Sequence, residues 1–303
     1  MFDLSYTGLK PGCLSGEVAV VTGATSNVGK GYAQALAWAG AKVVVVGRNE
    51  TRGQAVVDTI NADCGNGTAI FVKCDVGDAA DVAALKDAAI SAFGKVDILL
   101  NNAMDLSLNG PILGSPIEDL DRAYYTSARA VMLAVNAFVP DMIERHHGAV
   151  SFSTTQFHYI PGMLGGSIYT ASKAAATSAM MSLANEIKGS GVNVFCLAPA
   201  GVGAINPASQ KEITEEMKAM RMPGFPGLIP ADAAGAGMVY LLLHADEMHG
   251  TGTMIGDVLK AMHFPFPCPE TLVDYPRVYT ADMQLTLLPC YMGHECVSEP
   301  AAE

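Results

Sequence analysis

Short apolar runs alternate along most of the chain with longer segments of helical character. The apolar runs are typical of buried strands, and we expect strands at residues 18–21, 43–46, 69–72, 96–100, 149–153 and 192–197. The segments between and after them predict helices at residues 32–40, 51–62, 79–93, 118–145, 168–188 and 231–245. Strands that are apolar almost without interruption are buried on both faces, which indicates a parallel sheet covered by helices. We therefore predict an α/β fold with a doubly wound parallel sheet, whose ligands bind at the carboxyl ends of the strands.

Two segments interrupt this alternation. Residues 203–228 combine several Met and Pro residues after the last predicted strand, and we interpret them as a lid over the substrate. Residues 262–303 are rich in Pro and Cys and show no periodicity. We interpret them as a C-terminal extension that packs on the domain or on a neighbouring subunit, so that residues 1–261 form a single domain.

The composition narrows the class of partner. Half of the 303 residues are hydrophobic, which is enough for a large core, and the net charge is −12. This negative charge argues against nucleic acid and anionic membranes as partners. No apolar run has the length of a membrane span, and the first residues lack the pattern of a signal peptide. The 7 cysteines are odd in number and scattered, so we expect reduced thiols and a cytoplasmic protein.

A glycine-rich turn follows the first predicted strand, in the stretch from Thr22 to Gly31. A helix that begins directly after such a turn offers free backbone N–H groups and the positive end of its dipole, which together bind a phosphate. The second predicted strand ends at Gly47 and is followed by Arg48, where an NAD site would carry an acidic residue for the ribose hydroxyls. The planar guanidinium of Arg48 instead suits a 2′-phosphate. These two features predict a dinucleotide site that prefers NADP(H) to NAD(H).

Tyr169 and Lys173 are four residues apart on a predicted helix and therefore share one face. A nearby ammonium group lowers the pKa of a phenol, which suits proton transfer to a developing alkoxide near neutral pH. The small residues that follow, from Ala174 to Ala179, favour a closely packed and buried setting for this pair.

Several motifs in one order now resemble those of the classical short-chain dehydrogenase/reductase family, over about residues 14–260. They are the turn Thr22-Gly23 to Gly29, the pair Asp75-Val76, the run Asn101-Asn102-Ala103, the pair Tyr169 and Lys173, and the segment Pro199 to Val202. The resemblance implies a Rossmann fold and a catalytic Tyr169 that exchanges a proton with the substrate oxygen. It also implies that Lys173 lowers the pKa of Tyr169 and binds the nicotinamide ribose, while hydride passes to or from the nicotinamide.

The resemblance further implies the residues of both sites. For the cofactor these are Gly23, Thr25, Ser26, Asn27, Val28, Gly29, Arg48, Asn49, Asp75, Val76, Asn102, Ala103, Tyr169, Lys173, Pro199 and Val202. For catalysis they are Tyr169, Lys173, Thr154 and Ser127. Thr154 falls where the family has a serine, with Ser153 and Thr155 as rivals, and Ser127 falls where it has a helix asparagine.

The chain departs from the family pattern at further positions. Asn27 replaces the middle glycine of the turn, and we expect it to adopt the left-handed conformation that asparagine tolerates best after glycine. Ala200 and Ala204 replace residues that the family places beside the nicotinamide. Residues 156–168 are slightly longer than the family usually shows, which predicts an enlarged loop at the substrate, with His158 as a candidate contact.

Three functions fit this pattern. The first is an oxidoreductase that uses NADP(H) to interconvert a ketone or aldehyde with an alcohol, on a bulky apolar small molecule. The second is a non-redox isomerase, lyase or cyclase in the same pocket, suggested by the departures at Ser127, Thr154, Ala200 and Ala204. The third is a cofactor-binding module without catalysis, which would need neither Tyr169 nor Lys173.

Two further expectations concern metals and assembly. Cys290, His294 and Cys296 lack a fourth ligand at a convincing spacing, so no metal site is expected. The segments 118–145 and 168–188 resemble the helices that form the family's subunit interface, which predicts a homodimer or homotetramer.

Overall fold

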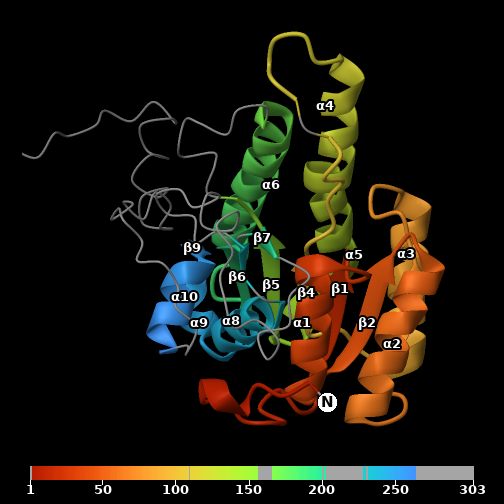
Figure 1. Cartoon of the computed structure of the whole chain (residues 1–303), viewed down its shortest axis with the longest axis vertical. Coiled ribbons are helices and arrows are strands. Elements are labelled where there is room, and N and C mark those ends of the chain that lie inside the picture. The colour runs from red at the N-terminus through yellow and green to blue at the C-terminus, as the bar shows by residue number, and fades with distance from the viewer. Residues whose placement is uncertain are drawn as a thin grey trace, which may run out of the picture.

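The computed structural model describes residues 2–108, 110–155, 166–199, 201–202, 228–229 and 231–263, and it is built around a seven-stranded parallel sheet (Figure 1). The strands of this sheet are β1 (Val18–Thr22), β2 (Lys42–Gly47), β3 (Ala69–Lys73), β4 (Ile98–Asn101), β5 (Gly148–Ser153), β6 (Val192–Ala198) and β9 (Thr251–Met254). A second, two-stranded sheet pairs β7 (Gly201–Val202) with β8 (Leu228–Ile229). The helices are α1 (Asn27–Trp38), α2 (Glu50–Cys64), α3 (Ala79–Phe93), α4 (Ile117–Tyr124), α5 (Ala130–Glu144), α6 (Ser167–Glu186), α8 (Ala231–Leu243), α9 (Ala245–Met248) and α10 (Ile255–Ala261).

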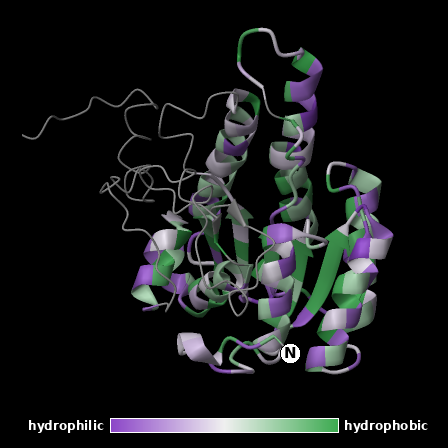
Figure 2. Cartoon of the chain, viewed as in Figure 1, coloured by the Kyte–Doolittle hydropathy of each residue, from purple (hydrophilic) through white to green (hydrophobic). Residues whose placement is uncertain are grey.

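The sheet is buried on both faces because successive side chains of each strand point to opposite sides. In β1, Ala19 and Val21 join the core formed with α1, α2 and α8, whereas Val18 and Val20 join the core formed with α3, α5 and α6. The central strands are accordingly hydrophobic along their length, while the outer helices carry hydrophilic stripes (Figure 2). This confirms the predicted doubly wound α/β fold.

The strand order β3-β2-β1-β4-β5-β6-β9 reverses direction between β1 and β4. The chain leaves β1 toward β2 and β3, then returns to pair β4 with the other side of β1. Loops that leave β1 and β4 therefore diverge at their carboxyl ends and open a crevice there, which is where ligands bind in sheets of this kind.

The predicted helix at 118–145 differs from the structure, where α4 and α5 are separated by a π-helical turn at Tyr125–Arg129. The hydroxyl of Thr126 donates to the carbonyl of Arg122 (3.2 Å), and that of Ser127 donates to the carbonyl of Ala123 (2.7 Å). Hydroxyls that bond back to carbonyls four residues earlier compete with the helical ladder and loosen it. The widened turn places Ser127 toward α6.

Several elements of the described structure were missed from the sequence. They are the seventh strand β9, the helix α10 that follows it, the short strands β7 and β8, the short helix α9 and a 3₁₀ turn at Ser5–Thr7. β9 contains Gly252 between two threonines and is only partly buried, so it lacks the apolar run by which the other strands were recognised. Among the described residues, no helix has both the length and the apolar character needed to cross a membrane.

Candidate active site

The glycine-rich turn joins β1 to α1 at the carboxyl edge of the sheet. Gly23 has a φ of 66°, and a Cβ atom there would lie 2.8 Å from the Cα of Ala103, so the turn packs directly on the end of β4. A Cβ on Gly29 would lie 2.3 Å from the carbonyl oxygen of Gly23. Asn27 has a φ of 46°, which confirms the expected left-handed conformation at this position.

The N-terminus of α1 fits a phosphate group. No side chain caps this end, and its first turn contains no acidic residue. The first N–H groups of a helix have no partner within the helix, and the dipole gives this end a partial positive charge. Thr25, Ser26 and Val28 border the same end, so a pyrophosphate can approach backbone donors here without meeting a negative side chain.

A hydrogen-bond network ties this turn to the ends of β4 and β5. The hydroxyl of Thr22 accepts from the backbone N–H groups of Asn102 (2.9 Å) and Ala103 (3.1 Å). The side-chain amide of Asn102 donates to the carbonyl of Thr22 (3.1 Å), and its oxygen accepts from the hydroxyl of Ser153 (3.0 Å). Asn102 therefore fixes the glycine-rich turn to the ends of β4 and β5.

The residues expected around the adenosine lie at the ends of β2 and β3. Arg48 follows β2 with its side chain 65% exposed, and its Nη2 lies 4.0 Å from a carboxylate oxygen of Asp105. The side chain of Asn49 caps α2 by accepting from Arg52 N (2.9 Å), so this oxygen already has a structural partner. The carboxylate of Asp75 accepts from the N–H of Gly77 (3.2 Å), and Val76 lines a small cavity with Ala103.

Tyr169 and Thr155 meet at the carboxyl end of β5. The phenol of Tyr169, in the first turn of α6, shares a hydrogen bond with the side chain of Thr155. The hydroxyl of Thr154 instead bonds to that of Thr177, which itself donates to the carbonyl of Lys173 (2.8 Å). Thr154 therefore faces α6, and Thr155, previously a rival candidate, is the residue in contact with Tyr169.

Lys173 lies one turn further along α6 and is only 3% exposed. Its ammonium nitrogen donates to the backbone carbonyl of Ser153 and lies 4.6 Å from the ring centroid of Phe152 and 5.9 Å from that of Tyr169. Burial removes water from the charge and lowers the pKa of Lys173 to about 7.

In the protein alone the pKa of Tyr169 is raised, so the predicted lowering by Lys173 stays a prediction. Burial raises the pKa of Tyr169, and the hydrogen bond from Thr155 offsets this only in part. Desolvation of the phenol is the largest cause of this shift. In the protein alone, Tyr169 is therefore a protonated phenol at neutral pH.

Ser127 lies within the π-helical turn and is buried. Its hydroxyl donates to the carbonyl of Ala123 (2.7 Å) and lies 3.2 Å from that of Ser172, one residue before Lys173. The structure thus brings Ser127 against the backbone of α6, in the segment that carries Tyr169 and Lys173.

The remaining predicted site residues follow β6 along the chain. Pro199 directly follows the carboxyl end of β6, and Val202 is the last residue of β7. Several other predictions fall outside the described residues. These are Ala200, Ala204, His158, most of the proposed lid and enlarged loop, and nearly all of the C-terminal extension with Cys290, His294 and Cys296.

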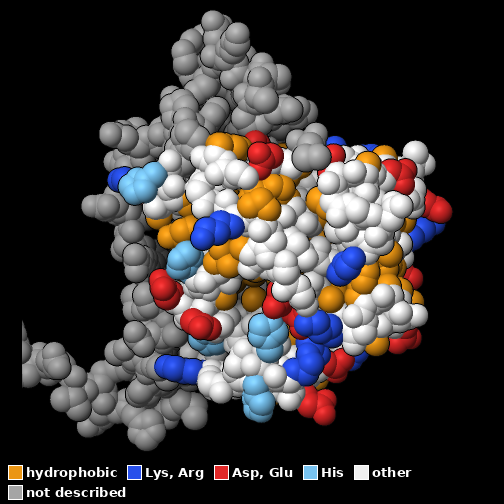
Figure 3. All heavy atoms as spheres, turned by 90° about the horizontal axis from the view of Figure 1, so that it is seen from below, with side chains coloured by type: hydrophobic (Ala, Val, Ile, Leu, Met, Phe, Trp, Pro, Cys, Tyr) orange, Lys and Arg blue, Asp and Glu red, His pale blue; other side chains and the backbone are white. Residues whose placement is uncertain are grey.

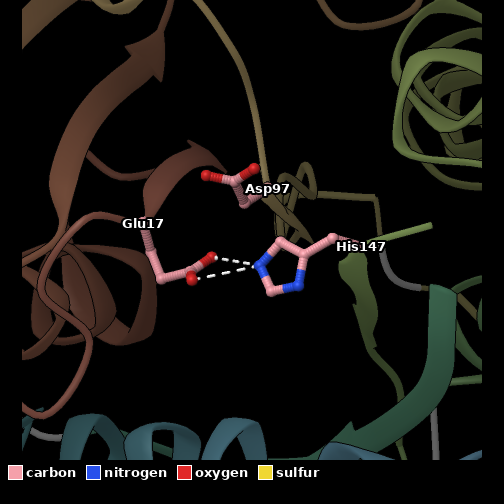
Figure 4. Close-up of side chains that lie close together, drawn as sticks. All are labelled: Glu17, Asp97 and His147. Atoms are coloured by element: carbon pink, nitrogen blue, oxygen red, sulfur yellow. Dashed lines mark hydrogen bonds and ion pairs between the residues drawn. The ribbon is translucent and has the colours of Figure 1, made fainter. Parts of the chain in front are cut away.

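A cluster with metal-binding side chains lies at the opposite, amino-terminal edge of the sheet (Figure 4). Ligand atoms of Glu17, Asp97 and His147 lie within 4.8 Å of one another. However, the buried carboxylate of Asp97 already pairs with Lys95 (2.8 Å) and Arg145 (3.1 Å), and His147 bonds to Glu17 (3.0 Å). The molecule seen from below mixes cationic, acidic and histidine side chains (Figure 3), and we interpret this cluster as structural ion pairs.

Comparisons with known proteins agree with this geometry. A family model described as short chain dehydrogenase matches residues 17–217. The chain is 35% identical over 235 residues to a short chain dehydrogenase of Pseudocercospora fijiensis, covering 73% of this chain and 74% of the relative. It is 32% identical over 206 residues to 7alpha-hydroxysteroid dehydrogenase of Escherichia coli strain K12, covering 68% and 78%.

A solved structure shows the same fold. The structure of 7 alpha-hydroxysteroid dehydrogenase complexed with NADH and 7-oxo glycochenodeoxycholic acid matches with a TM-score of 0.70 and 28% identity, covering 84% of this chain and 96% of that one. These comparisons match the chain over most of its length. The same chain contains the doubly wound sheet, the glycine-rich turn and the pair Tyr169 and Lys173. The chain belongs to the short-chain dehydrogenase/reductase family.

Proposed function

We propose that the protein is an NADP(H)-dependent oxidoreductase that interconverts a ketone or aldehyde with the corresponding alcohol. The observation that carries this proposal is the contact between the Tyr169 phenol and Thr155, beside the buried Lys173 and at the same sheet edge as the glycine-rich turn. When bound, the nicotinamide cofactor supplies or accepts the hydride. The chain's own groups manage the proton and the orientation of the carbonyl.

Tyr169 acts as the proton donor in the direction of reduction. Since burial raises its pKa, the phenol holds its proton at neutral pH and is ready to give it to the carbonyl oxygen. The carbonyl carbon then gains a hydride and the oxygen gains the phenol proton, which yields the alcohol. The hydroxyl of Thr155 orients this oxygen and the phenol together, in the role that the sequence assigned to Thr154.

Lys173 suits the return of a proton to Tyr169. With a pKa of about 7, its amine exists in both protonation states near neutral pH. Its bond to the Ser153 carbonyl also fixes α6 against the end of β5, which positions the phenol. The contact of Ser127 with the backbone of α6 supports the same region from the other side.

The preference for NADP(H) rests on Arg48. Its exposed guanidinium lies beyond the end of β2 and has room to meet a 2′-phosphate, and the neighbouring Asn49 is engaged in capping α2. We expect Arg48→Ala to weaken NADP⁺ binding about tenfold or more and to leave NAD⁺ binding nearly unchanged, since a hydrogen bond to a charged group contributes about 1.5–3 kcal/mol. Arg52→Ala, which removes an exposed arginine of the adjacent helix α2, is the control.

The substrate is proposed to be a bulky apolar carbonyl compound or alcohol. The Escherichia coli relative is named 7alpha-hydroxysteroid dehydrogenase, and the solved structure is of a complex with 7-oxo glycochenodeoxycholic acid. Both names support a substrate with a polycyclic skeleton. A panel of polycyclic, aliphatic and aromatic ketones therefore tests both the substrate class and the redox reaction. The assay follows the loss of NADPH absorbance and quantifies the alcohol product.

Tyr169→Phe is the deciding variant. We expect it to lower the rate of reduction by at least about a hundredfold, because general acid catalysis contributes on that order, with NADP⁺ binding within about threefold of wild type. Tyr124→Phe, at a partly exposed tyrosine of α4, should retain full activity. Full activity of Tyr169→Phe would refute the proposed mechanism. Substrate conversion without NADPH consumption would instead support the non-redox alternative.

A further inference from the structure

Asp105 lies between two arginines at the rim of the proposed adenosine site. One of its carboxylate oxygens is 4.0 Å from Nη2 of Arg48 and 3.7 Å from Nη2 of Arg122. Arg48 follows β2 and Arg122 belongs to α4, so two distant segments of the chain meet at this one oxygen. Both arginine side chains are exposed, at 65% and 61%, whereas that of Asp105 is 17% exposed.

The carboxylate of Asp105 is held in place. Its other oxygen accepts from the backbone N–H of Ser107 (3.1 Å) and from the Ser107 hydroxyl (2.6 Å). These bonds, together with the two arginines, lower the pKa of Asp105, so it carries its negative charge at neutral pH. The arginines can move because they are exposed, but the carboxylate is fixed by the loop.

A 2′-phosphate and the Asp105 carboxylate compete for the same cations. A phosphate that reaches Arg48 must draw its guanidinium away from Asp105 and must then lie near a fixed negative charge. Like charges at such short separation repel, and the effect on an exposed pair is modest. A cofactor with free ribose hydroxyls has no such charge and meets no such repulsion.

We infer that Asp105 is a specificity-determining residue, which occupies Arg48 and Arg122 and so limits the preference of this protein for NADP(H) over NAD(H). The inference rests on the proposed role of Arg48 in binding the 2′-phosphate. Removal of the Asp105 charge frees two guanidinium groups for the phosphate and strengthens NADP⁺ binding alone.

Asp105→Asn tests the inference by calorimetric titration of the full chain with NADP⁺ and NAD⁺. The asparagine oxygen can still accept from Ser107, so the loop keeps its turn. We expect the Kd for NADP⁺ to fall by about threefold to fivefold, the upper part of the range that exposed charge pairs give, and the Kd for NAD⁺ to stay within about twofold. In 1 M salt the gain should largely disappear, because exposed charges are then screened.

The matched control is Asp119→Asn. Asp119 pairs with Arg122 (3.8 Å), so the variant removes an equal charge beside Arg122 without touching the Arg48 contact. We expect both dissociation constants to stay within about twofold of wild type. If Asp105→Asn does not fold, Asp105→Ser removes the same charge and keeps a hydroxyl acceptor for the turn.

The outcomes separate this inference from the proposed function. If the Asp105 variant leaves both constants unchanged, or changes both equally, while Arg48→Ala weakens NADP⁺ alone, the inference is wrong and the NADP(H) preference stands. If Arg48→Ala does not weaken NADP⁺, the proposed preference itself is wrong and the inference falls with it. A selective gain for NADP⁺ in the Asp105 variant, absent from the Asp119 control, supports the inference.

Discussion

The buried amine of Lys173 makes the stability of the free protein depend on pH in a way that can be calculated. Burial lowers its pKa from 10.5 to about 7, whereas in the unfolded chain the pKa returns to 10.5. Between these two values the unfolded state binds more protons than the folded state, so stability rises with pH through this window. The penalty is fully present below about pH 7 and is absent above the unfolded pKa.

The size of this effect follows from the shift. One pKa unit corresponds to about 1.4 kcal/mol, so the whole window is worth at most about 5 kcal/mol. Lys173→Met removes the titrating group and keeps much of the apolar stem. The variant also leaves the Ser153 carbonyl without its donor, at a cost of about 1–3 kcal/mol that does not vary with pH. The buried charge is therefore reported by how the difference in unfolding free energy between Lys173→Met and wild type changes with pH. The constant part of that difference reports the lost hydrogen bond.

The assay is urea unfolding of the cofactor-free protein, under reducing conditions, from pH 6 to pH 10. We expect the free energy of unfolding of Lys173→Met, relative to wild type, to fall by several kcal/mol as the pH rises across this range. Lys260→Met, which removes an exposed ammonium of α10, should run parallel to wild type because water solvates that charge in both states. Parallel curves for Lys173→Met and wild type would refute the reasoning.

Two further predictions concern the phenol and the core. Thr155→Val should lower the rate of carbonyl reduction about tenfold or more through loss of the hydrogen bond to the phenol, and Thr154→Val should lower it much less. A single-turnover comparison of the two variants that gave the opposite order would return the role to Thr154. Gly31→Ala should destabilise the fold by about 3 kcal/mol, because its Cβ would lie 2.2 Å from the Ala231 carbonyl oxygen, whereas Gly256→Ala, with open space around it, should be neutral or stabilising by up to about 1 kcal/mol. Equal melting temperatures for these two glycine variants would contradict the packing argument.

Most of the fold could be predicted because its signals are local. The four valines of β2 and the other apolar runs predict buried strands. The helices between these strands indicate a parallel sheet. β9 escaped detection because Thr251 and Thr253 flank a glycine, so that its place in the sheet depends on pairing with β6 and not on its own sequence. The π-helical turn within the helix predicted at 118–145 likewise depends on where two hydroxyls point, which a hydrophobic pattern does not encode.

The sequence motifs predicted which residues lie at the candidate site, but not which of their side chains are in contact. Spacing alone placed Tyr169 and Lys173 on one helix face, yet the choice between Thr154 and Thr155 depends on which side chain the end of β5 turns toward the phenol. The raised pKa of Tyr169 in the protein alone was not foreseen, because a rule based on the nearest charge omits burial. Asp105 and Arg122 were not singled out, since their meeting with Arg48 joins three segments that only the fold brings together.

Ser153 connects the pair Tyr169 and Lys173 to the glycine-rich turn. Its carbonyl accepts from Lys173, and its hydroxyl donates to Asn102, which in turn donates to the carbonyl of Thr22. A continuous chain of hydrogen bonds therefore runs from the amine of α6, across the ends of β5 and β4, to the turn that begins α1. Because every link lies at the carboxyl edge of the sheet and is at least partly buried, the distance between the Lys173 amine and the glycine-rich turn is set by strand spacing and not by loop conformation. Preorganisation of this kind is what hydride and proton transfer to one carbonyl group require.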